Sequence, residues 1–212
     1  MLIRLGSAAV WALVGAAEAK YIAPRWLAEL DGAPESAPFS IASALLWGIV
    51  GLVYPLWQYP FTALIYGVMT LLLIRIAVTD FITFTIPNRC SACLALLGIA
   101  RLAADHTHFS EQLIGALIIS LPFWALHALT RGRGLGFGDV KLMAAAGFLL
   151  GAPRVLLATV LGSVLGSVIH IWRMRGGAEA RLAFGPYLSL GIYLSALFGD
   201  RLIAAYLSLF GL

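Results

Sequence analysis

Long apolar runs, separated by short stretches that carry the charges, prolines and many glycines, dominate the chain. A helix of about 20 mostly apolar residues crosses a bilayer, so each run is a candidate transmembrane segment. The runs lie at about 3–19, 39–57, 61–79, 90–104, 111–130, 140–152, 155–172 and 186–198. The pattern predicts an all-α fold, a polytopic integral membrane helical bundle of about eight transmembrane helices.

Two of these runs have unusual lengths or ends. The sixth, 140–152, is too short to cross a bilayer alone, so it needs neighbours that cover it or thin the membrane. The last run is interrupted by Gly199, Asp200 and Arg201, after which a further short helix is expected. Glycines four residues apart, Gly147/Gly151 and Gly162/Gly166, predict close helix–helix approach.

Composition supports this reading. Of the 212 residues, 61% are hydrophobic and 11% charged, and the mean hydropathy is +0.95. Soluble domains have roughly 45–50% apolar and about 25% charged residues. The spans use most of the length, so a single membrane domain over residues 1–212 is expected.

The basic residues are distributed unequally between the two sides. Eight spans place both termini on one side, and the loops after the odd-numbered spans, with their borders, hold ten of the 14 lysines and arginines. These are Lys20, Arg25, Arg75, Arg89, Arg131, Arg133, Lys141, Arg173, Arg175 and Arg181. Cytosolic loops of membrane proteins carry such an excess, so these loops, including residues 20–38, are predicted to be cytosolic. Because topology accounts for the basic residues, no nucleic-acid partner is expected.

The N-terminus permits two interpretations. Residues 1–20 have a basic start at Arg4, an apolar middle and an Ala-Glu-Ala ending, as in a cleavable signal peptide. Removing this segment would move the loop at 20–38 to the outside and break the charge asymmetry. We therefore favour a retained helix.

Two aspartates stand out among the acidic residues. Asp80 closes an apolar span, and Asp139 opens the short sixth span directly after the glycine-rich run 132–138. Both are predicted at the cytosolic membrane face. Solvation in loops is expected to account for Asp105, Asp200 and the acidic residues at 18–35.

Two carboxylates in one partly desolvated site share a single proton at neutral pH, which is the state that aspartic proteases use. The ionised partner takes a proton from water, and the protonated partner donates to the scissile carbonyl. Glycines before Asp139 would leave room for an extended peptide. The alternative is that Asp80 and Asp139 cap helices or pair with Arg89, Arg133 or Lys141, and chemistry alone does not separate the two readings.

Three motifs, in order and spacing over about residues 60–200, resemble those of the type IV prepilin peptidases. They are Asp80 with Ile86-Pro87-Asn88, then Gly136-Phe137-Gly138-Asp139-Val140-Lys141-Leu142, then Phe184-Gly185-Pro186-Tyr187-Leu188. These are bacterial membrane aspartic proteases with a Gly-x-Gly-Asp motif.

The resemblance implies cleavage of the leader from type IV prepilins or type II secretion pseudopilins, at the cytosolic face of the bacterial inner membrane. It gives the catalytic role to Asp80 and Asp139. Shaping of the site falls to Gly136 and Gly138, with Lys141, Pro87 and Asn88 as further candidates.

Larger members of this family have a cytosolic insert with two C-x-x-C pairs that bind zinc, associated with methylation of the new N-terminus. The loop at 20–38 contains no cysteine, so no metal or other cofactor is expected and N-methyltransferase activity stays open. Cys90 and Cys93 form a lone C-x-x-C without partner ligands, and we interpret them as small core residues.

Two other functions are possible. A small proton- or cation-coupled transporter could use the paired aspartates, but it predicts charge deeper in the spans and an inverted repeat, and neither is apparent. A non-catalytic assembly factor could have kept the fold, although the presence of both aspartates and of Gly-x-Gly-Asp counts against it.

Overall fold

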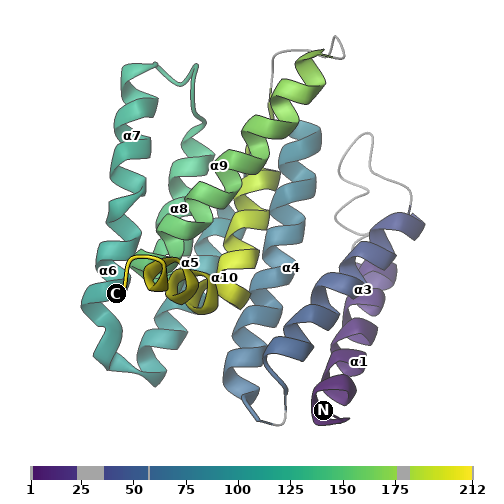
Figure 1. The fold of residues 1–212 in the computed structure, drawn as a ribbon. Helices are drawn as coiled ribbons and strands as arrows, with labels where there is room; N and C mark the ends of the chain where they lie inside the picture. The colour runs from purple at the N-terminus through teal and green to yellow at the C-terminus, as the bar shows by residue number, and fades with distance from the viewer. Residues whose placement is uncertain (1, 23–35, 57, 176–181, 212) are drawn as a thin grey trace. The chain divides into compact units, whose positions relative to one another are not determined.

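The computed structural model describes residues 2–22, 36–56, 58–175 and 182–211, and all the regular secondary structure in these ranges is helical (Figure 1). The elements are α1 (Leu2–Ala17), the π-helix η1 (Glu18–Ile22), α3 (Ser36–Val53), α4 (Pro60–Thr83), α5 (Asn88–Ala104), the 3₁₀ helix η2 (His106–His108), α6 (Phe109–Ile118), α7 (Ser120–Leu129), α8 (Phe137–Leu150), α9 (Ala152–Arg175) and α10 (Gly185–Ser208). Each predicted run coincides with a helix, or with the pair α6–α7, which confirms the all-α prediction.

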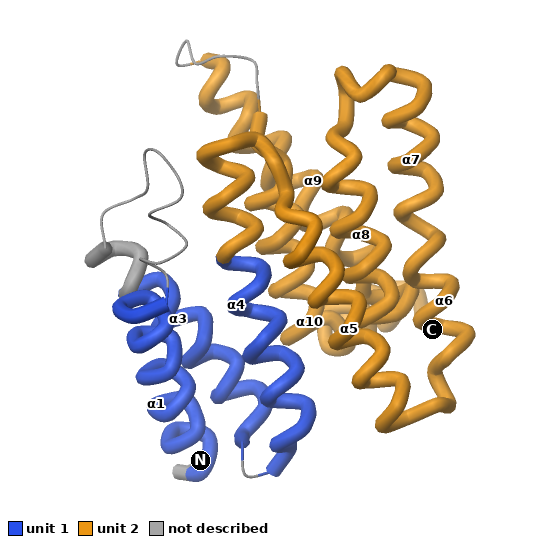
Figure 2. Tube along the Cα trace, turned by 180° about the vertical axis from the view of Figure 1, so that it is seen from behind, with its two compact units in different colours: residues 1–74 blue, residues 75–212 orange. Residues whose placement is uncertain are grey.

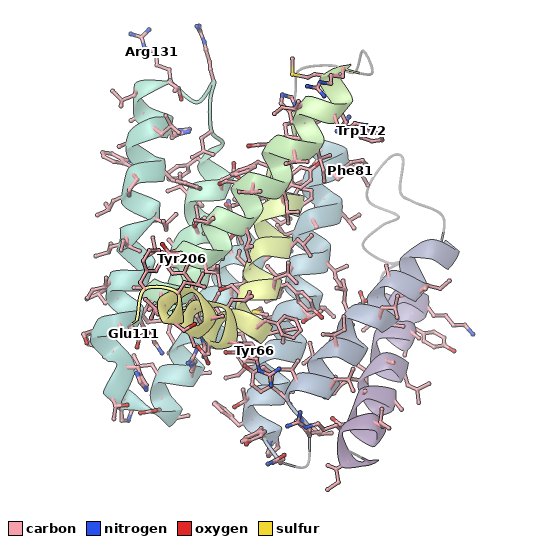
Figure 3. The ribbon with its side chains drawn as sticks, in the orientation of Figure 1. Tyr66, Phe81, Glu111, Arg131, Trp172 and Tyr206 are labelled. Carbon is pink, nitrogen blue, oxygen red and sulfur yellow. The ribbon has the colours of Figure 1, made fainter. Side chains whose placement is uncertain are left out.

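Four helical segments in the described ranges are long and apolar enough to cross a membrane. They are Pro60–Thr83, His106–Leu129, Ala152–Arg175 and Gly185–Ser208. A shorter apolar helix covers Ile41–Val53. Large apolar side chains on these helices are exposed, among them Phe81, Trp172 and Tyr206 in Figure 3. Exposed apolar surface on this scale fits helices whose outer faces meet lipid.

Two local details differ from the prediction. The run at 111–130 is divided at Ile119, because Pro122 lacks the N–H that would bond to the Ile118 carbonyl and its ring crowds that carbonyl. The expected interruption at 199–201 does not end the helix, since α10 continues to Ser208, but the last part of α10 runs in a different direction from its first part (Figure 1). Asp200 accepts hydrogen bonds from Arg154 Nε at 2.8 Å and Arg154 Nη2 at 2.5 Å, so its charge is compensated without a break in the helix.

The chain divides into two compact units, residues 1–74 and 75–212 (Figure 2). In the first, α1 packs on α3, and the rings of Trp11 and Trp47 stack with centroids 5.1 Å apart. Glu18 is buried there, and Ser43 Oγ donates to Glu18 Oε2 at 2.8 Å. Solvation therefore does not account for Glu18, whereas the other acidic residues of that loop, at 29, 31 and 35, lie outside the described residues.

In the second unit, the short helix α8 packs against α5, α6, α7, α9 and α10. Its residues Leu142, Met143, Ala146 and Leu149 have no exposed surface. Neighbouring helices thus cover the sixth run, which explains how so short an apolar segment is accommodated. The prediction that residues 1–212 form one domain stays a prediction.

Candidate active site

Asp80 lies in the last turn of α4 and is buried, with 6% of its surface exposed. The helix ends just beyond it at Phe84, whose backbone N–H donates to the Asp80 carbonyl at 2.8 Å and whose φ is +54°. This left-handed turn leads into the Ile86-Pro87 segment before α5. The carboxyl group therefore projects from the C-terminal end of a helix.

The N-terminus of α10 holds the Asp80 carboxyl group. Gly185, the first residue of α10, donates its backbone N–H to Asp80 Oδ2 at 2.8 Å. The positive end of the helix dipole and this N–H both favour the ionised carboxylate. A Cβ at Gly185 would lie 2.7 Å from Asp80 Oδ2. Glycine is therefore the residue that permits this approach.

Asp139 lies in the first turn of α8, with 7% of its surface exposed. Gly136 is the N-cap residue, and its carbonyl accepts the Asp139 backbone N–H at 3.2 Å. A Cβ at Gly136 would lie 3.2 Å from Asp139 Oδ2, and one at Gly138 would lie 3.0 Å from the Cβ of Ile86. The first glycine thus leaves room beside the carboxyl group, and the second lets the start of α8 pack against Ile86.

His127 holds the loop between α7 and α8 in place through two contacts. Its Nδ1 donates to the Leu135 carbonyl at 2.8 Å, and its ring lies 5.4 Å from that of Phe137. Gly132 has φ of +75° and donates to the His127 carbonyl at 2.9 Å. These contacts hold the backbone of the glycine-rich loop that precedes Asp139.

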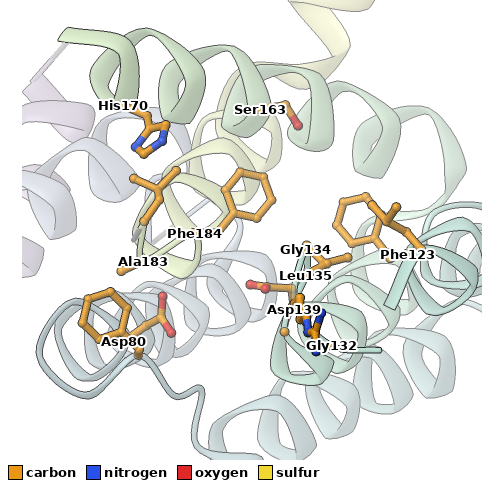
Figure 4. Close-up of a pocket in the computed structure, with 15 residues that line it drawn as sticks. Asp80, Phe123, Gly132, Gly134, Leu135, Asp139, Ser163, His170, Ala183 and Phe184 are labelled. Carbon is orange, nitrogen blue, oxygen red and sulfur yellow. The ribbon is translucent and has the colours of Figure 1, made fainter. Parts of the chain in front are cut away.

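Both carboxyl groups line one cavity of about 690 Å³ (Figure 4). Its walls come from the ends of α4 and α7, the glycine-rich loop, the start of α8, α9, and the segment that enters α10. In Figure 4 the Asp139 carboxyl group points toward the side of the cavity on which Asp80 lies. The structure therefore brings together the two aspartates that the sequence singled out.

Burial is the main electrostatic influence on Asp139, which lies outside the four candidate membrane spans. Burial and, to a smaller extent, the negative charge of Asp80 together raise the pKa of Asp139 to about 7, against a hydrogen bond from the Gly136 backbone that lowers it. The charge of Asp80 therefore favours the protonated form of Asp139.

The remaining predicted site residues occupy different positions. Gly136 lines the cavity, and Gly138 stands one residue before Asp139. Pro87 is the N-cap residue of α5. Asn88 and Lys141 meet each other, with Lys141 Nζ donating to Asn88 Oδ1 at 3.0 Å, but neither lines the cavity of the aspartates.

Several residues at the cavity were not among the site residues predicted from the sequence. Phe184, Ser163 and His170 line it, and Gly185 contacts Asp80 directly. The third motif, at 184–188, was the available signal for Phe184 and Gly185. Ser163 and His170 lie on an apolar helix where nothing in the pattern distinguishes them.

Cysteines and possible metal ligands lie apart from the aspartate pair. Cys90 is buried as expected, whereas Cys93 is exposed and is not a core residue. Within the described ranges, no group of three or more His, Cys, Asp or Glu side chains is arranged to hold a metal ion.

Comparison with known proteins gives consistent matches. The model of the type IV leader peptidase family, Peptidase_A24, matches residues 67–171, which include both aspartates. A Bacillus subtilis protein named prepilin leader peptidase/N-methyltransferase is 31% identical over 173 residues, covering 80% of this chain and 68% of that protein. Proteins of the same name from Pseudomonas aeruginosa (30% over 185 residues, 81% and 61%) and Aeromonas salmonicida (28% over 148 residues, 66% and 51%) are also similar.

The chain thus spans about half to two thirds of the length of these curated relatives. No solved structure matches the chain.

Proposed function

Because this chain belongs to the type IV leader peptidase family, a family of proteases, we propose that it is an aspartic endopeptidase. Its substrates are type IV prepilins or type II secretion pseudopilins, whose leader it removes at the cytosolic face of the bacterial inner membrane. The relatives' printed name and the cytosolic location inferred from the basic loops support this substrate and this side.

The observation that carries the proposal is the aspartate pair in one cavity. Asp80 and Asp139 come from different helices, are each more than nine-tenths buried, and interact electrostatically. An ordinary helix cap needs neither burial nor a second carboxylate nearby. A pair that shares one proton supplies a base and an acid at once.

The environments divide the two roles. Asp80, held by the Gly185 N–H at the N-terminus of α10, is the ionised base, and Asp139 holds the shared proton. Asp80 removes a proton from water, the resulting hydroxide attacks the scissile carbonyl carbon, and the proton of Asp139 passes to the carbonyl oxygen. Collapse of the tetrahedral intermediate breaks the C–N bond: Asp80 gives its proton to the leaving amine, and Asp139 recovers one from the hydroxyl group.

The cavity also suits the substrate's conformation. A helix shields its own carbonyl groups by hydrogen bonds, so the scissile bond must be presented in extended chain. A volume of about 690 Å³, walled on one side by glycines 132, 134 and 136, leaves room for a few residues of extended backbone beside the aspartates.

The test is cleavage of a candidate prepilin by the purified protein in lipid nanodiscs. Asp80→Asn and Asp139→Asn should each lower the cleavage rate about 10³-fold or more, because each removes one half of the acid–base pair. Asp105→Asn, at an exposed loop position, is the matched control and should cleave normally. Normal cleavage by both active-site variants would contradict the proposal, and the product mass would show whether a methyl group is added.

A further inference from the structure

A second hollow lies between α5 and α8. This α5–α8 groove has a volume of about 420 Å³. On α5 it is lined by Asn88, Ser91, Ala92 and Ala95. On α8 it is lined by Lys141, Ala144, Ala145 and Phe148. Each set has the i, i+3, i+4, i+7 spacing of a single helix face, so the groove follows both helices for two turns, about 10 Å.

The groove is separate from the cavity of the aspartates. Successive residues of an α-helix are rotated by about 100°, so Lys141, Ala145 and Phe148 lie on the face of α8 opposite Asp139. Neither aspartate lines the groove. A ligand bound here is therefore not a substrate at the scissile position.

One end of the groove is polar and positively charged. Lys141 Nζ donates to Asn88 Oδ1 at 3.0 Å and lies 4.7 Å from the centre of the Phe137 ring. An ammonium group has three N–H donors, so this bond leaves donors for an anion. Asn88 and Ser91 belong to the first turn of α5, where the helix dipole adds partial positive charge.

Ser91 provides independent evidence for a ligand. Only 6% of the surface of Ser91 is exposed, and its Oγ has no hydrogen-bond partner among the described residues. A buried hydroxyl without a partner costs free energy. Ser91 lines the groove beside Asn88, so rotation of its hydroxyl group about the Cα–Cβ bond would turn the O–H toward a phosphate oxygen placed near Lys141.

Below this polar end the groove is apolar. Its lining there is Ala92, Ala95, Ala144, Ala145 and Phe148. The small alanine side chains leave room for an acyl chain along the groove. Among the described residues, no carboxylate lines the groove to pair with the cationic part of a zwitterionic headgroup.

We propose that the α5–α8 groove binds an anionic phospholipid, with its phosphate at Lys141 and Ser91 and an acyl chain along the alanines. This inference stands on the groove alone and holds whether or not the chain is a peptidase. It adds a lipid site on the face of α8 opposite the catalytic carboxyl group.

The first test is native mass spectrometry of the full-length protein with dioleoyl phosphatidylglycerol, compared with dioleoyl phosphatidylcholine of the same acyl chains. The wild-type protein should retain the anionic lipid preferentially. Lys141→Gln should weaken its retention about fivefold, the effect of one basic residue at a membrane surface. Ser91→Ala and Ala95→Leu, which remove the hydroxyl and fill the groove, should weaken it without a change in charge.

Arg89→Gln is the matched control, because Arg89 is an exposed neighbouring cation that does not line the groove. It should bind like the wild-type protein. Circular dichroism and elution volume establish that each variant is folded. Equal retention of the two lipids, no loss in Lys141→Gln and Ser91→Ala, or an equal loss in Arg89→Gln would overturn the proposal.

A second experiment distinguishes lipid from a protein segment. Phe148→p-benzoylphenylalanine places a photoreactive benzophenone in the groove. In membranes that contain a prepilin, irradiation should yield a phospholipid adduct on the peptide that carries residue 148. Crosslinking to the prepilin helix in place of lipid would assign the groove to the protein partner and overturn the proposal.

Discussion

At the scale of single residues, the contact between Gly185 and Asp80 joins positions 105 residues apart. The contact exists only because residue 185 has no side chain, since its Cβ would meet Oδ2, Cβ and Cγ of Asp80 at 2.7–2.9 Å. The same backbone N–H supplies the hydrogen bond that favours the ionised carboxylate. One glycine thus combines a steric and an electrostatic role.

Gly185→Ala should therefore lower cleavage strongly while leaving the helices intact. The added methyl group forces the N-terminus of α10 away from Asp80, so the hydrogen bond is lost and the base is misplaced. We expect a fall in kcat of about 10²-fold, measured on the nanodisc-bound protein with a prepilin. Gly199→Ala, in the same helix, serves as the control, because its Cβ would approach only side-chain atoms of Arg154 and Ser195, at 3.2 Å or more. Equal effects of the two substitutions would contradict the role given to Gly185.

The proton on Asp139 predicts a pH dependence. Because its pKa is about 7, the pair loses its acid as the pH rises through this value, and both carboxylates become ionised. The cleavage rate should fall on the alkaline side of about pH 7. A rate that stays constant or rises from pH 7 to pH 9, with the prepilin and the protein both intact, would exclude Asp139 as the proton donor.

The same shift affects stability with a definite sign. Between the ordinary aspartate pKa of 3.8 and about 7, the folded protein keeps a proton that the unfolded chain releases. This contribution to the free energy of unfolding is present at low pH and lost as the pH rises through that window. Asp139→Asn should lack this dependence, which denaturant titrations at pH 5 and pH 8 would measure.

At the scale of helices, glycines decide how closely the elements approach. Gly147 of α8 and Gly115 of α6 touch backbone to backbone, and a Cβ on either would overlap the other's carbonyl oxygen. Gly162 of α9 approaches α10 at Leu188 in a similar way. Gly151 ends α8 with φ of +85° and also lies against α6, where a Cβ on Gly115 would come within 2.7 Å of the Gly151 backbone carbon, so a turn accompanies the close approach that its spacing predicted.

Gly147→Ala should be destabilising, because the overlap with Gly115 separates α6 from α8. The expected loss is about 1–3 kcal/mol, measured by thermal or denaturant unfolding in detergent. Gly48→Ala is the matched control, since a Cβ there would lie 3.6 Å from the Cβ of Ala12, an ordinary contact. It should be neutral or stabilising by up to about 1 kcal/mol. Similar losses in both variants would show that close approach is not the cause.

At the scale of the whole molecule, the unequal distribution of basic residues makes sidedness testable. Positive charge in cytosolic loops predicts that the glycine-rich loop faces the cytosol and that the turn at 106–108 faces outward. In a Cys93→Ser background, Arg133→Cys should react with a membrane-impermeant maleimide only after the cells are broken. His106→Cys should react in intact spheroplasts, and the reverse pattern would contradict the predicted orientation.

The approximate positions of the helices and the choice of Asp80 and Asp139 as candidate site residues could be predicted from the sequence by itself. Apolar runs long enough to span a membrane are local features of the sequence, because a desolvated segment must satisfy its own backbone hydrogen bonds and therefore forms a helix. The ends of these runs agree with the observed helices to within a few residues. The exception is α10, which runs about ten residues further than predicted. The motifs at Asp80 and Asp139 were likewise legible from neighbouring residues.

Contacts between segments far apart in the sequence became visible only in the folded structure. The folded structure places Gly185 against Asp80, buries Glu18 against Ser43, pairs Asp200 with Arg154, and puts Asn88 and Lys141 in a groove away from the aspartates. Each outcome rests on a contact between residues at least 25 positions apart. Hydrophobic periodicity carries no information about such contacts, since it reports which faces are apolar and not which helices they meet.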